Sequence, residues 1–152
     1  MKDKPSVTSV DTRRYRSTLQ ITFAYDGERV RLASIQRLQG IAPGSPPPAP
    51  KVGTNSGSWV ELRDAQDRLL FYRVLHNPVR YMVDEHLPDG RIRAVAGPPE
   101  VGAFEVLLPD IPEAASVALF SSPFDMARSG ELAEEIGRFS LRETDPGKGG
   151  QR

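Results

Sequence analysis

The residues best suited to chemistry lie in one short stretch of the chain. His76 precedes the run Asp84, Glu85 and His86, and Asp89 follows closely. Imidazole and carboxylate groups bind zinc and non-haem metals, and adjacent strands would bring the two histidines together. Consecutive strand residues point to opposite faces, however, which separates Glu85 from its neighbours, and no His-Glu-x-x-His motif is present. We therefore assign no metal ligand and expect a solvated strand edge here.

Other catalytic signatures are missing as well. There is no Gly-x-Ser-x-Gly elbow, and Ser121-Ser122-Pro123 is typical of a turn that ends a strand. Asp64 and Asp67 fall in a polar segment between two predicted strands, where turn formation accounts for both. The sequence lacks the glycine-rich patterns of phosphate-binding loops and contains no cysteine. We therefore predict no catalytic residue and no cofactor.

Charge and hydropathy exclude several classes of partner. Twenty basic and twenty acidic residues cancel to a net charge of +0. A balanced chain has no overall field that would attract nucleic acid or an anionic membrane. The local cluster Arg13-Arg14-Tyr15-Arg16 has no basic stripe to extend it and is read as a solvated arm. No apolar run approaches the roughly 18 residues of a membrane helix, and the N-terminus lacks a signal-peptide core, so we expect a cytoplasmic protein.

The strongest structural pattern lies in residues 58–75. Val60 and Leu62 alternate with Trp59, a polar turn follows, and a second apolar and aromatic run begins near Leu69. This pattern predicts a β-hairpin with one buried face. Trp59 is interpreted as a core residue of a central strand, rather than as an exposed anchor for a partner.

Short strands are predicted along most of the remaining chain. A turn at Asp26-Gly27 separates the first two, and the apolar phase of the second shifts near Ala33-Ser34, which indicates a bulge. Alternation assigns one core to Leu19, Ile21, Phe23, Val60, Leu62, Phe104, Val106, Val117 and Leu119. Residues 125–136 are predicted to form a short helix, because Met126, Leu132 and Ile136 fall roughly on one side. Phe139 and Leu141 are assigned to a last strand.

Proline and glycine divide the chain. Residues 40–57 contain five prolines, which exclude a central strand and predict an extended loop. Two PxxP segments within this loop, at 43–46 and 47–50, have the form of polyproline ligands, although linkers often contain it too. Residues 1–17 are expected to be a flexible arm and residues 143–152 a flexible tail. Residues 18–142 then form one domain.

These strands and turns resemble an immunoglobulin-like or fibronectin-like sandwich without the disulfide, over roughly residues 19–120. The fold class is therefore mostly β: an antiparallel β-sandwich with one short C-terminal helix. We expect a non-catalytic accessory module that binds another protein through loops or an edge strand, and we also consider self-association through such an edge. The alternative is a metal-dependent, carbohydrate-acting or other small-molecule enzyme that uses the region from His76 to Asp89.

Overall fold

The computed structural model describes residues 10–27, 29–76, 82–96, 101–123, 128 and 130–141, with the backbone alone for residues 82–86 and 92–96. Apart from a 3-10 turn, η1 (Thr12–Arg14), the regular elements of these residues are all strands. The strands are β1 (Ser17–Asp26), β2 (Arg29–Gln39), β3 (Ser58–Asp64), β4 (Leu69–Leu75), β5 (Met82–His86), β6 (Ile92–Ala96), β7 (Gly102–Pro109), β8 (Ala114–Ser121) and β9 (Glu134–Ser140).

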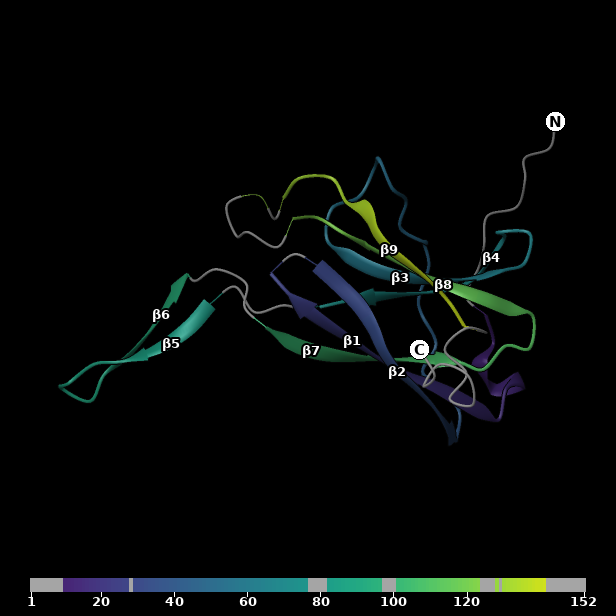
Figure 1. The fold of residues 1–152 in the computed structure, drawn as a ribbon, viewed down its shortest axis with the longest axis horizontal. Helices are drawn as coiled ribbons and strands as arrows, with labels where there is room; N and C mark the ends of the chain where they lie inside the picture. Colours follow the sequence, from purple (N-terminus) through teal and green to yellow (C-terminus); the bar gives the residue numbers. More distant parts are fainter. Residues whose placement is uncertain are drawn as a thin grey trace.

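Seven of these strands form two antiparallel sheets that pack face to face (Figure 1). One sheet has the order β2-β1-β7 and the other the order β4-β3-β8-β9. The remaining strands, β5 and β6, pair only with each other. Figure 1 shows this hairpin standing away from the two sheets, on the left of the view. The mostly β, two-sheet prediction is confirmed.

The core fills the space between the two sheets, because alternate residues of each inner strand face it. Eight of the nine predicted core residues are buried, and Phe104 packs against them from a half-buried position. Phe23 is fully buried, with its ring centroid 5.4 Å from that of Phe104 and 5.7 Å from that of Phe139. The predicted bulge is also present, since the β1–β2 register passes from Ser34 to Leu32 and leaves Ala33 unpaired.

The predicted C-terminal helix is wrong. Residues 134–136 belong to β9, which pairs with β8 through contacts such as Phe139 opposite Val117. Residues 124–127 lie outside the described part of the chain, and Leu132, a residue of the proposed apolar stripe, is exposed. The last strand thus starts before the predicted Phe139, because pairing along the edge of the sheet outweighs a weak helical pattern.

Strand order limits the resemblance to immunoglobulin domains. In those domains the first strand lies at the edge of its sheet and the second is central. Here β1 is central and pairs with both β2 and β7, while β2 lies at the edge. The protein therefore shares the two-layer arrangement of immunoglobulin domains, but the order of strands in its first sheet is different.

Replacing Phe23 with alanine should lower the free energy of unfolding by about 3–5 kcal/mol, because a fully buried ring between two sheets leaves a cavity. Urea denaturation followed by circular dichroism measures the loss. Val101→Ala is the matched control, since Val101 is 76% exposed and its truncation should cost within about 0.5 kcal/mol. Equal, small losses for both variants would contradict the assigned core.

Candidate functional site

Trp59 is buried, but not between the sheets. Val60 and Leu62 take the core face of β3, so Trp59 lies on the opposite, outer face of that sheet. There it is 1% exposed and packs with Ala118, Phe120 and Ala133. Its ring stacks on Phe120, with centroids 5.3 Å apart and planes 12° from parallel. The prediction of a buried tryptophan is correct, whereas its assignment to the sandwich core is wrong.

A buried carboxylate lies beside this tryptophan. Glu61 is 5% exposed, and its Oε2 accepts a hydrogen bond from Trp59 Nε1 at 3.0 Å. Its Oε1 accepts from Arg63 Nε at 2.9 Å and also from Arg63 Nη2. Both carboxylate oxygens therefore have donors, as a buried charge requires. A carboxylate held in this way fixes the positions of Trp59 and Arg63 on the outer face.

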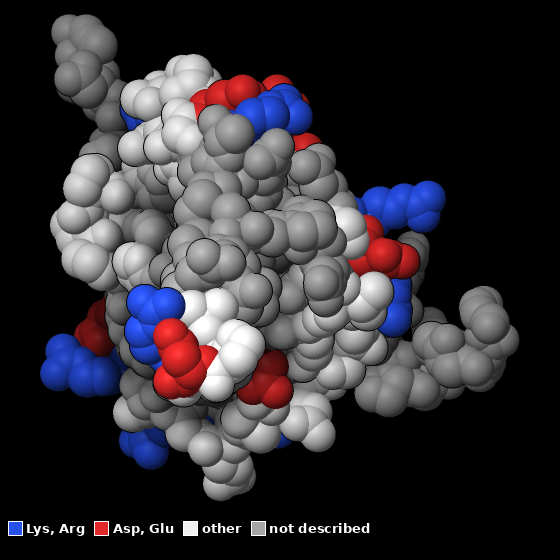
Figure 2. All heavy atoms as spheres, turned by 90° about the vertical axis from the view of Figure 1, so that its left-hand side faces the viewer, with Lys and Arg blue, Asp and Glu red and all other residues white. Residues whose placement is uncertain are grey.

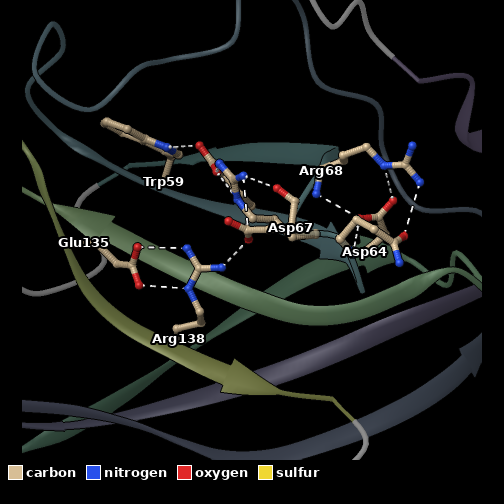
Figure 3. A network of polar contacts seen from close by, with 9 residues as sticks. Trp59, Asp64, Asp67, Arg68, Glu135 and Arg138 are labelled. Carbon is tan, nitrogen blue, oxygen red and sulfur yellow. Dashed lines mark hydrogen bonds and ion pairs between the residues drawn. The ribbon is translucent and has the colours of Figure 1, made fainter.

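The polar contacts continue from Arg63 across the outer face to β9 (Figure 3). Arg63 Nη1 donates to the backbone carbonyl of Asp67 at 2.8 Å. The Asp67 carboxylate then pairs with Arg138, which also donates two hydrogen bonds, of 3.0 and 2.9 Å, to Glu135. Hydrogen bonds from Arg138 hold the pKa of Glu135 below its ordinary value, and Glu135 in turn raises the pKa of Arg138. Both groups therefore stay charged at neutral pH, which suits a structural pair better than proton transfer.

Asp64 and Asp67 form the turn between β3 and β4, as predicted. Asp64 Oδ1 accepts hydrogen bonds from the backbone N–H groups of Gln66 and Arg68, at 2.9 and 2.8 Å. The bond from the Arg68 N–H is the largest cause of the lowered pKa of Asp64. Asp67 has φ 65°, a left-handed conformation that aspartate tolerates better than most residues.

The proline-rich loop is tied to the sandwich by the side chains of two neighbouring residues of β4. The Tyr72 hydroxyl donates to the Pro46 carbonyl at 2.7 Å. Arg73 donates to the carbonyls of Pro43 and Gly44, at 2.6 and 3.1 Å, and to Ser45 Oγ at 3.2 Å. We refer to residues 42–50 as the proline strap, and its Ala42 and Ser45 are buried.

Arg73 also joins the two sheets. Its Nε donates to the Leu107 carbonyl of β7 at 2.9 Å, so the same side chain contacts the strap and the edge of the opposite sheet. Its guanidinium carbon lies 5.1 Å from the centroid of the Phe71 ring. Burial lowers the pKa of this guanidinium, but arginine remains protonated in proteins. None of the described carboxylates pairs with it, so backbone carbonyls satisfy the charge.

These contacts bear on the PxxP segments. A groove that binds a polyproline ligand takes up its exposed backbone carbonyls as well as its rings. In residues 43–46 the carbonyls of Pro43, Gly44 and Pro46 already accept hydrogen bonds from β4. The first PxxP segment is therefore bound to β4 of the same chain. Binding of a partner by the second segment, residues 47–50, stays a prediction.

The residues of the predicted histidine and carboxylate cluster lie after β4 and in the projecting hairpin, and the side chains of residues 84–86 are outside the described part of the structure. Asp84, Glu85 and His86 lie in β5, and exposed His76 follows the end of β4. Asp89 belongs to the hairpin turn, where its carboxylate accepts from the N–H of Arg91 at 3.0 Å and pairs with Arg91 Nε at 2.7 Å. Over the residues whose side chains are described, no three His, Asp or Glu groups gather as metal ligands.

The remaining candidates have structural roles or remain exposed. Ser58 and Ser121 hydroxyls lie 2.8 Å apart, and Ser122 Oγ accepts from the N–H of Gly57 at 2.8 Å, so these serines join neighbouring segments. Ser121 and Ser122 also line a hollow of about 170 Å³, in which Arg128 pairs with Glu131. Within its described lining, the Ser122 and Arg128 side chains already have partners in the protein.

A wider depression of about 630 Å³ lies at the tip of the β1–β2 turn, and residues on both sides of that turn line it, including Tyr25, Arg29 and Arg31. Both arginines are exposed and the depression is open. Viewed from the hairpin end, the described acidic and basic groups are interspersed, without a large patch of one sign (Figure 2). Among the described residues, this end of the molecule therefore has neither an enclosed pocket nor a cluster of basic side chains.

The N-terminal segment has more structure than a solvated arm requires. Asp11 caps η1 and pairs with Arg13 at 3.0 Å, while Arg14 lies over the Tyr15 ring at 5.9 Å. Thr12 is buried and Tyr15 packs against the core. Residues 1–9 and 142–152 lie outside the described residues, so the flexibility of arm and tail stays a prediction.

Comparison with known proteins gives no match: no family model fits the sequence, and neither curated proteins nor solved structures include a similar chain at the threshold used. Within the described residues, no helix is long and apolar enough to cross a membrane.

Replacing Arg73 with methionine should release the proline strap, because methionine keeps an unbranched apolar stem and removes every donor to Pro43, Gly44 and Leu107. We expect faster proteolytic cleavage within residues 40–57 and a loss of about 1.5–3 kcal/mol in unfolding free energy. Arg68→Met is the control, because the Arg68 side chain is 73% exposed. A strap that resists cleavage equally in both variants would show that Arg73 does not hold it.

Replacing His76, Asp84 and His86 together with alanine should leave the melting temperature unchanged, because the sequence predicts a solvated strand edge here and surface substitutions usually change stability by no more than about 0.5 kcal/mol. A chelator should likewise leave the melting curve of the wild type in place. Bound metal would stabilise the folded state by mass action. Stoichiometric metal in the wild type, lost from the triple variant by mass spectrometry, would instead support the metalloenzyme alternative.

Proposed function

We propose that the chain is a non-catalytic interaction module in which the β5–β6 hairpin binds another protein by adding a strand at its edge. The observation that carries this proposal is the position of the hairpin. It stands away from the sandwich, and none of the described strands other than its own partner pairs with β5 or β6 (Figure 1).

The edges of the sandwich are poor places for strand addition. The β7 carbonyl of Leu107 is occupied by Arg73, and the proline strap is bound to β4. The long edge strand β2 carries a bulge and exposed Arg31 and Arg37, and β9 is charged and has a register shift. Charges, bulges and covering loops are the usual protection of edge strands against further pairing.

The hairpin lacks most of this protection on one side. A two-stranded hairpin is marginally stable in water and gains stability from added strands or a packing surface. The strand β6, Ile92–Ala96, contains no proline and no acidic residue, and Arg93 is its one charge. The strand β5 carries Asp84 and Glu85, which make its edge less favourable for pairing. The edge of β6 is therefore the better candidate.

The register identifies the backbone groups available on that edge. Leu87 N–H donates to the Arg91 carbonyl at 2.8 Å, which marks a hydrogen-bonded pair at the turn. Hydrogen-bonded and non-hydrogen-bonded pairs alternate along an antiparallel ladder. The pairs Glu85–Arg93 and Val83–Val95 are then bonded within the hairpin. The N–H and C=O groups of Ile92, Ala94 and Ala96 consequently face outward, and an added strand would bond to them.

The double variant Asp84→Pro, Ala94→Pro tests this function, because each proline removes an outward N–H that the hairpin does not use itself. Affinity capture from the host, followed by quantitative mass spectrometry, should show partners that the wild type retains and the double variant loses. Melting temperatures of the two proteins should agree. Identical sets of captured proteins would refute binding through the hairpin edges.

A matched control separates edge pairing from a general loss of the surface. Arg31→Ala and Arg37→Ala change exposed side chains of β2 and leave the hairpin intact. They should retain every partner that the wild type captures. Loss of the same partners in these β2 variants would place the interaction on the sandwich instead.

A further inference from the structure

We infer that β6 pairs with β6 of a second copy of the same chain, around a two-fold axis at Ala94. The result would be a four-stranded antiparallel sheet in the order β5-β6-β6-β5. The inference rests on the proposed function, since it names the partner that the open edge accepts. It commits to self-pairing because the residues of β6 are compatible with their own copy.

The compatibility appears when β6 is placed antiparallel to itself. With the axis at Ala94, Ile92 of each chain lies opposite Ala96 of the other, Arg93 opposite Val95, and Ala94 opposite Ala94. No like charges face each other, and all five residues of Ile92–Ala96 are paired. The outward N–H and C=O groups of Ala94 in each chain would exchange two hydrogen bonds at the centre.

Other arrangements are less favourable. Moving the axis to Arg93 brings the two copies of that arginine into direct opposition, which destabilises a sheet. Pairing β5 with its own copy in full register sets Asp84 opposite Asp84. Pairing β5 of one chain with β6 of another avoids like charges but is head to tail, so one β6 edge stays unpaired and can add further chains. The β6–β6 arrangement is closed and has compatible charges.

Cross-linking tests the register directly, because the chain contains no cysteine. Residues opposite each other in a hydrogen-bonded pair have Cα atoms about 5.5 Å apart, a distance that a disulfide can span. Under mild oxidation, Ala94→Cys should give a disulfide-linked dimer of twice the 16.7 kDa chain mass. Asp84→Cys, the control on the outward edge of β5, should remain monomeric.

Two outcomes of this cross-linking overturn the inference. If Ala94→Cys stays monomeric after oxidation, β6 does not pair with itself at Ala94. If cross-links instead form mainly between the two variants when they are mixed, β5 pairs with β6 and the assembly is head to tail. Unlike a lysate experiment, both results are read from purified protein.

Sedimentation equilibrium measures the association without a covalent link. Wild type and Asp84→Pro should dimerise with similar dissociation constants. The dissociation constant of the Ala94→Pro dimer should be higher by a factor of at least about ten. Equal affinities for all three proteins would overturn self-pairing through β6. If the wild type is a monomer, yet the double-proline variant loses captured partners, the self-pairing inference fails while the proposed function stands. If the wild type is a monomer and the double-proline variant captures the same partners as the wild type, the self-pairing inference and the proposed function both fail.

Discussion

The closure of one side of the sandwich depends on Arg73, a cation whose partners include backbone carbonyls from the strap and from β7. Two sheets that pack face to face must be closed along their sides, and an open side exposes unpaired carbonyls to water or to other chains. Arg73 closes one side by binding the carbonyl of Leu107 across the gap between β4 and β7. The same planar group holds the strap at Pro43 and Gly44, as five donors in a fixed fork allow. Lysine has neither that geometry nor that number of donors in a plane.

This closure separates a stable body from a projecting element. The hairpin lies in the connection between β4, which ends at Leu75, and β7, which begins at Gly102. Because Arg73 and Leu107 already join these strands, the connection between them can extend outward without disturbing either sheet. Binding elements are commonly presented in this way, on segments that a rigid scaffold positions but does not require for its own stability.

The sequence predicted the parts of the fold that alternation determines. In β1, β3, β7 and β8 every second residue is apolar and faces the other sheet. The core that contains Phe23 and Val117 could therefore be identified from the sequence. Alternation also separates Trp59 from Val60, but it does not show that the outer face is covered too. Trp59 is covered by Ala133, which is distant from it in the sequence. The Ala133 N–H donates a hydrogen bond to the Asn55 carbonyl at 2.9 Å, which holds this segment in place. Long-range contacts of this kind have no local signature. The same holds for β9, where a weak helical pattern was outweighed by pairing with β8.

The sequence carries one signal for the role of Arg73. Phe71, Arg73 and Leu75 alternate on one face of an otherwise apolar strand, and a charged residue at such a position requires partners. The sequence could have identified that requirement, although not the strap that meets it. The hairpin differs again, because its separation from the sandwich depends on which strands find partners.

The outer-face aromatic pair also gives the protein a built-in optical reporter. Trp59 is the only tryptophan, so intrinsic fluorescence excited at the indole comes from one environment. The indole stacks on Phe120 and donates to the Glu61 carboxylate, away from the space between the sheets. Its emission therefore records whether the covering segment near Ala133 is in place, while tyrosine and backbone signals follow the sandwich as a whole. Comparing the two signals would distinguish a local opening of the outer face from loss of the fold.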